Sequence, residues 1–304
     1  MNLEKNPIAF TLGSQRFNIK KKLFSKFGTF KAKEIISKTG PTILYKAHRN
    51  EDTLTLSIKA FNLLKLNTLD KNNIRNIIFV TETPVKLFPG NGYIFASKTS
   101  FQNKINIIDV NAGCTGFVDA LKIANSFNGN TLIICSETYS KHIQKFDRSV
   151  STLFSDAASV FVFDKKRFNI IKYTSGFEKN TFDDLFCNQD SVLKMKGANV
   201  FNFCTSTVLP NLKKFIRENN VNITKIYIHQ GSSLVIDFFR SQFLDNKILI
   251  PSNIMKIGNT VSSSIPILMY NDLKNNNLKK GSYFILCSFG VGLAFNIMLL
   301  KHNG

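Results

Sequence analysis

The sequence predicts an α/β protein built from two similar halves. Short apolar runs rich in β-branched and aromatic residues alternate along the chain with segments whose apolar residues recur every three or four positions. Such alternation is typical of strands and helices that pack in layers. Of the 304 residues, 43% are hydrophobic and 20% are charged, so the chain falls within the globular range and is long enough for a large core.

The first part of the chain contains five predicted strands, with a helix between the second and the third. The strands are IIFV (77–80), INIIDV (105–110), TLIICS (131–136), SVFVF (159–163) and NIIKY (169–173). Residues 115–127 are predicted to be helical because their apolar side chains fall on one face of a helix, namely Phe117, Ala120, Leu121, Ala124 and Phe127.

The rest of the chain repeats this alternation. Helices are predicted over 201–219, 233–243 and 262–273, and strands over 225–229, 282–289 and 293–300. The charged turn from Asp164 to Arg167 separates two strands and is typical of a boundary. We therefore expect an N-terminal half over 1–166 and a C-terminal half over 167–304.

The chain is strongly basic. Its 40 Lys and Arg residues against 20 Asp and Glu residues give a formal net charge of +20, which favours acidic partners. Only seven of the basic residues are arginines, and no helix-turn-helix, zinc-ligand or aromatic RNA-binding pattern accompanies them. We therefore expect a solvated lysine surface and no nucleic-acid partner.

The cysteine pattern and the hydropathy indicate the cellular compartment of the protein. The five cysteines are widely spaced and include no CxxC pair, so neither a disulfide framework nor a metal site is predicted. No stretch reaches the ~18 apolar residues of a membrane span. The segment MNLEKNPIAF at the start lacks the layout of a signal peptide. We expect a cytoplasmic protein.

Cys114 is the candidate nucleophile. It follows the strand 105–110 through the small-residue turn 111–113 and opens the helix predicted from Thr115. Because N–H groups at a helix N-terminus favour negative charge, we expect a lowered pKa for its thiol. The alternative is a small buried hydrophobe, which is how we interpret the other four cysteines.

His229 and Asn259 are candidate partners from the second half. His229 ends the strand KIYIH, and α/β folds place reactive side chains at the carboxyl ends of strands. Asn259 precedes small residues and a predicted helix, a position that also fits a helix cap. The segment SFGVGLAF (288–295) fits either a hairpin or a turn that aims N–H groups at an oxyanion. The remaining histidines stand in polar sequence and are expected at the surface: His48, His142 and His302.

The order of these motifs resembles the β-ketoacyl-acyl carrier protein synthase III family of the thiolase-like superfamily. The motifs are DVNAGCTGF (109–117), IHQ (228–230), GNT (258–260) and FGVG (289–292). Similar segments extend over nearly the whole chain, namely SKTGP (37–41), TETP (81–84), FPG (88–90), FDRSVSTLFSDAAS (146–159) and MKGANVFNF (195–203). The resemblance implies the five-layered αβαβα thiolase fold, two pseudo-symmetric halves and a homodimer.

The resemblance also implies roles for individual residues. Cys114 would carry an acyl group as a thioester, while His229 and Asn259 would hydrogen-bond the thioester carbonyl of malonyl-acyl carrier protein. The backbone N–H groups of Cys114 and Val291 would form the oxyanion hole. Contacts to substrate or carrier would come from Lys38, Arg148, Gly197 and, across a dimer interface, Phe88.

The implied reaction is a decarboxylative Claisen condensation of an acyl thioester with malonyl-acyl carrier protein. The acyl donor would be acyl-coenzyme A or acyl carrier protein, no cofactor would be bound, and the acidic carrier would be the partner of the basic surface. Two other readings are an acyltransferase that uses a hydroxyl or amine acceptor, and an inactive or partner-binding homologue.

Several positions depart from the family pattern. The tryptophan that stacks on adenine in the family is replaced by Glu34, and the chain has no Trp. The asparagine of the M-x-G segment is replaced by Ala198, and the middle glycine of the F-G-G-G turn by Val291. These losses favour a specialised paralogue over the housekeeping initiator of fatty-acid synthesis.

Overall fold

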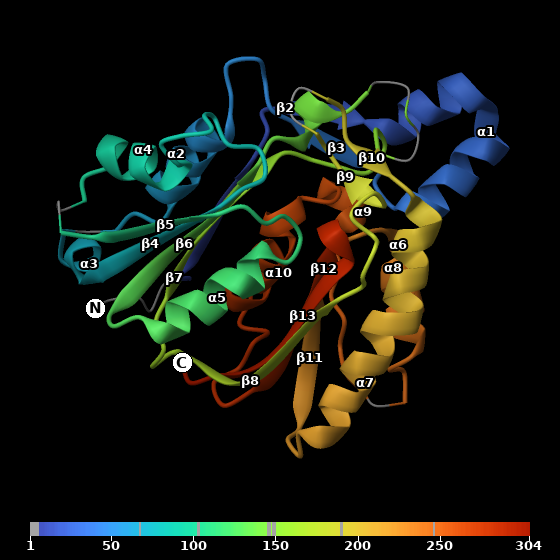
Figure 1. Cartoon of the computed structure of the whole chain (residues 1–304). Helices are drawn as coiled ribbons and strands as arrows, with labels where there is room; N and C mark the ends of the chain where they lie inside the picture. The colour runs from blue at the N-terminus through green and yellow to red at the C-terminus, as the bar shows by residue number, and fades with distance from the viewer. Residues whose placement is uncertain are drawn as a thin grey trace.

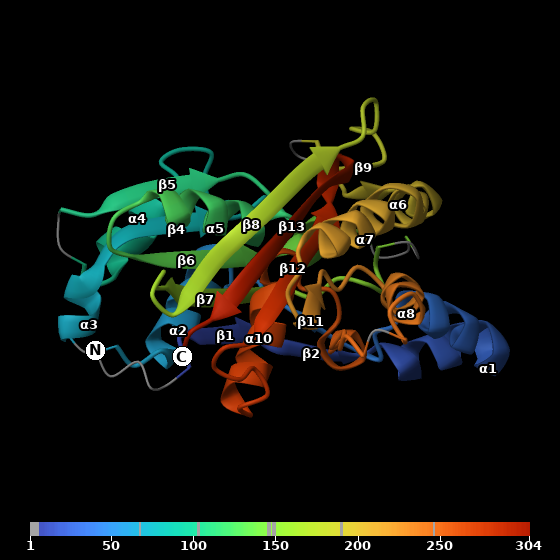
Figure 2. The same cartoon turned by 90° about the horizontal axis from the view of Figure 1, so that it is seen from below.

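Two β-sheets form the framework of the molecule, with helices between them and on both outer faces (Figures 1 and 2). The computed structural model describes residues 6–66, 68–101, 104–144, 147, 150–188, 191–245 and 247–304. Among these residues, no helix combines the length and the apolar character that crossing a bilayer requires.

The first sheet has the strand order β1-β7-β6-β4-β5. Its strands are β1 (Ile8–Leu12), β4 (Ile74–Val80), β5 (Asn106–Val110), β6 (Asn130–Glu137) and β7 (Ala157–Phe163). β4 pairs in parallel with β5 and β6, whereas β7 pairs antiparallel with β6 and β1. The four strands predicted between residues 77 and 163 are confirmed.

The second sheet has the order β11-β12-β13-β8. Its strands are β8 (Phe168–Phe177), β11 (Ile223–Ile228), β12 (Tyr283–Gly290) and β13 (Ala294–His302). β11 is parallel to β12, and the next two pairings are antiparallel. The run β4-β6-β7-β1 in the first sheet has the same sequence of directions, so β11 is the counterpart of β4 and the two halves are related by pseudo-symmetry.

The turn from Asp164 to Arg167 lies between the two sheets. Among the described residues, every strand of the first sheet ends before this turn and every strand of the second begins after it. We propose that the boundary between the two halves lies here. Two short antiparallel pairs complete the strands, β2 (Gln15–Asn18) with β3 (Ile43–Lys46) and β9 (Leu185–Phe186) with β10 (Lys194–Met195).

Five layers stack through the molecule. α5 (Gly116–Ser126) and α10 (Ser264–Lys274) form the middle layer and pack against the inner faces of both sheets. α2 (Thr53–Leu63) and α4 (Asn91–Lys98) cover the outer face of the first sheet. The outer face of the second sheet is covered by α6 (Gly197–Phe203), the π-helical turn η2 (Cys204–Val208), α7 (Leu209–Glu218) and α8 (Ser233–Ser241).

The layers follow from strand periodicity. In β4, Ile77 and Phe79 pack in the outer cluster, whereas Ile78 and Val80 pack against the middle helices. Strands buried on both faces read as continuous apolar runs, which is why they were recognisable in the sequence. The predicted helix over 115–127 is confirmed as α5.

Further helices connect these layers. They are α1 (Ile19–Thr39), α3 (Thr68–Asn73), α9 (Ile254–Ile257) and the 3-10 turns η1 (Tyr139–His142), η3 (Val261–Ser263) and η4 (Val291–Leu293). α1 runs along one end of the molecule and bends at Gly28, whose φ of 72° and ψ of 172° lie outside the helical region. Its mixed, lysine-rich sequence shows no clear apolar stripe, so periodicity did not predict it.

Candidate active site

Cys114 lies where the first sheet meets the middle layer. β5 ends at Val110, a short loop follows, and α5 begins at Gly116. The thiol is 5% exposed and belongs to the same apolar cluster as Tyr139, Leu185 and Phe289. The nucleophile predicted from the sequence therefore sits inside the molecule, where an acyl group on sulfur would be shielded from bulk water.

Two backbone N–H groups point at the sulfur of Cys114. One belongs to Cys114 itself and the other to Val291 in the turn η4. They are the two donors that the resemblance implies for an oxyanion hole, and the β-branched side chain at 291 has not removed the second. The segment 288–295 is also a hairpin, since β12 and β13 pair on either side of the turn.

The predicted acidity of Cys114 is wrong. Burial raises the pKa of its thiol well above the usual value, and the negative charges of Glu82 and Glu137 raise this pKa further. The N–H groups of Cys114 and Val291 lower the pKa but do not outweigh burial. The sequence argument considered only the helix N-terminus, whereas desolvation of a buried thiolate is the larger effect here.

His229 follows the last residue of β11 and is 2% exposed. Its Nδ1 lies 2.8 Å from the hydroxyl oxygen of Ser264, and its ring packs edge-on against Phe289 with 5.5 Å between ring centroids. Burial lowers the pKa of His229 to about 3, so the imidazole is neutral at pH 7. A neutral ring with one nitrogen held by Ser264 leaves the other free to donate or accept a proton.

Asn259 lies in the loop before η3 and is 2% exposed. Its side-chain oxygen accepts the N–H of Val261 at 2.9 Å, and its amide nitrogen donates to the carbonyl of Gly231 at 3.4 Å. The asparagine is not the N-cap residue of η3 or α10, which are Thr260 and Ser263, but its side chain holds the turn that precedes them and contacts the loop after His229.

The predicted trio is brought together through one chain of contacts. The backbone of Gly290 packs on Cys114, and the neighbouring Phe289 packs on His229. Asn259 then reaches Gly231, two residues beyond His229. Residues from both halves, more than 100 positions apart in the sequence, are thus linked through their immediate neighbours.

The residues predicted for substrate or carrier binding lie at the surface. Lys38 is exposed near the end of α1 and pairs with Glu34 at 3.0 Å, and Gly197 opens α6 with free space around its Cα. Phe88 is 82% exposed. Arg148 lies outside the described residues. His302, which we expected at the surface, is instead 5% exposed and stacks on Phe168.

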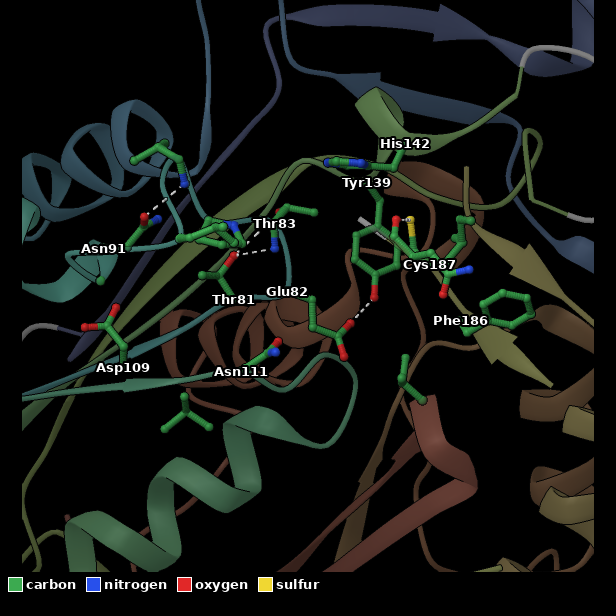
Figure 3. Close-up of a pocket in the computed structure, with 18 of the residues that line it drawn as sticks. Thr81, Glu82, Thr83, Asn91, Asp109, Asn111, Tyr139, His142, Phe186 and Cys187 are labelled. Atoms are coloured by element: carbon green, nitrogen blue, oxygen red, sulfur yellow. Dashed lines mark hydrogen bonds between the residues drawn. The ribbon is translucent and has the colours of Figure 1, made fainter. Parts of the chain in front are cut away.

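A cavity of about 870 Å³ lies next to the predicted site (Figure 3), although Cys114, His229 and Asn259 are not among its lining residues. The loop 81–91 forms one wall, Tyr139 and residues 185–188 form another, and Val291 and Gly292 close the end near Cys114. Asp109 and Asn111 line the part next to β5. The described residues contain no cluster of His, Cys, Asp or Glu side chains suited to a metal ion.

Two carboxyl groups at the cavity were not predicted, Glu82 in its wall and the fully buried Glu137 behind it. Glu82 accepts a hydrogen bond from the hydroxyl of Tyr139, and Glu137 accepts the N–H of Glu82 and the hydroxyl of Thr83. Burial raises the pKa of both carboxyl groups, and that of Glu137 well above its usual value. A signal was present in the sequence, because a charged residue follows the apolar run IIFV at the carboxyl end of a strand.

Family models match the two halves separately. The model described as 3-oxoacyl-[acyl-carrier-protein (ACP)] synthase III matches residues 108–177, and the model of its C-terminal part matches residues 217–302. The matched ranges contain Cys114, His229, Asn259 and the turn at 290–292. The chain belongs to the 3-oxoacyl-[acyl-carrier-protein] synthase III family.

Relatives and solved structures agree with this assignment. A β-ketoacyl-[acyl-carrier-protein] synthase III of Clostridium perfringens is 28% identical over 277 residues, covering 83% of this chain and 85% of that protein. The same enzyme of Clostridium acetobutylicum is 29% identical over 280 residues, covering 83% and 85%. The structure of β-ketoacyl-[acyl carrier protein] synthase III from Thermus thermophilus is similar with a TM-score of 0.86 at 23% identity, covering 98% of both chains.

The thiolase-like fold expected for a synthase III chain is confirmed, with five layers and two pseudo-symmetric halves. Departures from the synthase III pattern also have visible structural effects. Glu34, where the resemblance implies a tryptophan, pairs with both Lys31 and Lys38, which lowers the pKa of its carboxyl to about 2. This position is therefore charged.

Proposed function

We propose that this protein is a condensing enzyme that joins an acyl thioester to malonyl-acyl carrier protein with loss of carbon dioxide. The observation that carries the proposal is the convergence of two backbone N–H groups on the sulfur of Cys114. Such donors stabilise the oxygen that becomes negative when a thioester carbonyl is attacked. The family and its curated relatives support the same reaction.

In the first half-reaction Cys114 takes the acyl group. Because its thiol is neutral at rest, a base must take the proton as sulfur attacks the donor thioester, and neutral His229 is suited to that role. The bond to the donor thiol breaks, and the departing thiolate takes up the proton. The acyl oxygen then lies against the N–H groups of Cys114 and Val291.

In the second half-reaction malonyl-acyl carrier protein supplies the carbon nucleophile. The bond to its carboxylate breaks, carbon dioxide leaves, and the electron pair forms an enolate. Donors from His229 and Asn259 stabilise the enolate oxygen. The enolate carbon attacks the acyl carbonyl, the bond to sulfur breaks, and the Cys114 thiolate takes a proton from solvent.

The substrates are acyl-coenzyme A or acyl-acyl carrier protein as donor and malonyl-acyl carrier protein as extender, and no cofactor is needed. All five cysteines are free, which fits a reducing compartment, and we place the enzyme in the cytoplasm. Its pathway is the synthesis of fatty acids or of related acyl chains.

Intact-protein mass spectrometry tests the proposal. Incubation with acetyl-coenzyme A, or with acyl carrier proteins of several chain lengths, should add one acyl group at Cys114. Malonyl-acyl carrier protein should then remove that group and yield a ketoacyl product with carbon dioxide. An adduct that malonyl-acyl carrier protein cannot discharge would contradict condensation and favour transfer to another acceptor. No adduct from any donor would favour a binding-only homologue.

A homodimer is the proposed working state. β5 lies at the edge of the first sheet, and the loop beside it carries exposed apolar side chains, Leu87 at 72% and Phe88 at 82%. Exposed sheet edges and apolar patches favour association. Sedimentation should show twice the mass of 34.3 kDa, and Phe88→Asp should shift the equilibrium towards the monomer. A monomeric parent protein would contradict the proposal.

Docking of an acidic carrier protein is proposed to use lysines around the cavity mouth. Lys86 is exposed there, and Lys38 is exposed at the end of α1. Lys86→Glu should slow loading from acyl-acyl carrier protein about tenfold and leave loading from acyl-coenzyme A unchanged, and Lys38→Glu should also slow loading from the carrier. Lys214→Glu, on the exposed face of α7, is the matched control. Equal loading from the carrier by all variants would contradict this docking site.

A further inference from the structure

Glu82 is a charged group of the cavity that the condensation does not use. It lies two residues beyond β4, whose counterpart in the other half is β11, the strand that ends next to His229. Its side chain points into the cavity and meets Tyr139 (Figure 3). An ionisable side chain thus follows the carboxyl end of each of the two corresponding strands, Glu82 after β4 and His229 after β11.

The carboxyl group of Glu82 is held against Gly113, the residue that precedes Cys114 in the chain. The N–H of Gly113 and the hydroxyl of Tyr139 both donate to it. A Cβ added to Gly113 would lie 2.3 Å from Oε2 of Glu82 and 3.1 Å from the hydroxyl oxygen of Tyr139, so only glycine admits this approach. Cys114 follows directly in the chain.

The cavity connects Glu82 with the space that an acyl group must occupy. Glu82 and Val291 line the same cavity, and the N–H of Val291 points at the sulfur of Cys114. An acyl group whose carbonyl oxygen occupied the two N–H sites would therefore have its α-carbon on the side of Glu82. Tyr139 and Leu185 complete the wall on that side.

No cation pairs with Glu82 among the described residues. Its donors are a phenol hydroxyl and a backbone N–H, and its other neighbours include Glu137 and the thiol of Cys114. Burial disfavours the charged form and makes Glu82 a stronger base than an exposed glutamate. Burial and the neighbouring carboxyl group likewise raise the pKa of Glu137.

We propose that Glu82 removes an α-proton from an acyl group carried by Cys114, so that the bound acyl group itself becomes a carbon nucleophile. The proposal rests on the acyl-Cys114 intermediate of the proposed function and adds a reaction that releases no carbon dioxide. Its substrates are acyl thioesters with at least one α-hydrogen. The acceptor is a compound with an electrophilic carbonyl, polarised by His229 and Asn259.

The carbon–carbon bond forms without an oxidant, a reductant or loss of carbon dioxide, and water or a thiol is needed only to release the product. The α-C–H bond breaks, its proton moves to the Glu82 carboxylate, and its electron pair forms the carbon–carbon double bond of an enolate. The enolate oxygen is held by the N–H groups of Cys114 and Val291. Attack on the acceptor carbonyl forms the new carbon–carbon bond, and the acceptor oxygen takes the proton from Glu82. Water or a thiol then releases the product and restores the Cys114 thiol.

Hydrogen exchange on the acyl-enzyme tests this step without an acceptor. The protein is loaded with acetyl-coenzyme A in D₂O, quenched, and digested in H₂O so that backbone amides lose their deuterium while carbon-bound deuterium stays. The peptide that carries acetyl-Cys114 should gain up to three deuterons in the parent protein. In Glu82→Gln the exchange should be about 100-fold slower, as expected for loss of a general base.

Deuterium exchange is measured only on molecules that carry the acetyl group, so a variant that loads more slowly does not distort the result.

The matched control is Asp109→Asn, which removes a carboxyl group from the same cavity. In the parent protein an oxygen of Asp109 accepts the N–H of Gly92 at the start of α4. Exchange should persist in this variant. If Glu82→Gln does not take up the acetyl group, Glu82→Asp is used in its place. Aspartate is shorter by one methylene, so its carboxylate lies farther from the acyl group and exchange should again be slower.

The outcomes separate the two proposals. Absence of acetyl on Cys114 in the parent protein contradicts the proposed function itself. An acetylated parent that gains no deuterium, or variants at position 82 that exchange as fast as the parent, would overturn only the role of Glu82. Deuterium gained by the parent and by Asp109→Asn, and lost with the Glu82 carboxylate, supports it.

Discussion

A Cβ placed on Gly290 would lie 2.5 Å from the Cβ of Cys114 and 2.7 Å from its sulfur. The end of β12 therefore touches the nucleophile through a bare Cα, and this contact fixes the sulfur next to the N–H of Val291. Close approach of two backbones, more than loop flexibility, explains a glycine at this position.

Gly290→Ala should displace Cys114 and separate its sulfur from the N–H donors. We expect acylation from acetyl-coenzyme A to fall about 100-fold, since reactive groups misplaced by ~1 Å lose about that much rate. Overpacking should also cost about 1–3 kcal/mol of unfolding free energy. Acylation is followed by mass spectrometry and stability by urea unfolding; unchanged acylation would contradict the assigned donor geometry.

Cys114→Ala should abolish the acyl adduct. Cys187 needs a separate control, because it is exposed and lines the same cavity. Cys187→Ser should keep the adduct, and peptide mapping should place it on Cys114. Cys135 and Cys287 are buried in strands and should stay unmodified. An adduct on Cys187 that persists in Cys114→Ala would move the nucleophile to the loop after β9.

Asn259→Ala should separate the two half-reactions. Acyl loading of Cys114 should continue, whereas release of carbon dioxide from malonyl-acyl carrier protein should fall at least tenfold for want of a donor to the enolate. The variant should also lose about 1 kcal/mol of stability, because the N–H of Val261 loses its acceptor. Radiolabelled carbon dioxide measures the second step; release at the parental rate would exclude Asn259 from it.

The neutral, buried His229 should make stability depend on pH. In the unfolded chain histidine binds a proton near pH 6.5, whereas folded His229 binds one only near pH 3. The unfolded state therefore binds more protons between these values, and stability falls as the pH falls through this window. Between pH 7.5 and pH 5 the loss due to His229 is about 2 kcal/mol.

Comparison with His229→Gln isolates this effect. Other groups with shifted pKa values, such as His302 and Asp156, occur in both proteins and cancel in the difference. Urea unfolding at pH 7.5 and pH 5 should show a smaller loss of stability in His229→Gln than in the parent. Identical losses would mean that His229 titrates normally in the folded protein.

The sequence predicted the central strands and the Cys114, His229 and Asn259 motifs because local pattern determines them. Strands buried on both faces are continuous apolar runs, and each motif residue stands beside a strand or turn with its own signal. β1 escaped prediction because it is short and pairs with β7, about 150 residues away. Its structure depends on the partner strand more than on its own residues.

The shifted pKa values of the site residues depend on contacts between distant parts of the chain, which no local sequence pattern encodes. The thiol pKa of Cys114 is raised because burial and two carboxyl groups from other strands outweigh the helix N-terminus. Glu82 stood in the recognised TETP motif, yet its approach to Gly113 appears only when β4 and β5 are side by side. His302 was misjudged for a similar reason, since Phe168 on the neighbouring strand covers it.

The placement of β13 has a consequence for how the protein matures. β13 is an interior strand of the second sheet, and β8 pairs with no other strand of that sheet. During synthesis the first sheet has all its strands once residue 163 has emerged from the ribosome, whereas the second must wait for residue 302. His229 and the turn at Val291 are positioned only at that late stage. Cys114 is therefore synthesised before α10, His229 and Val291, which complete its surroundings, so the assembly of the site follows the order of synthesis.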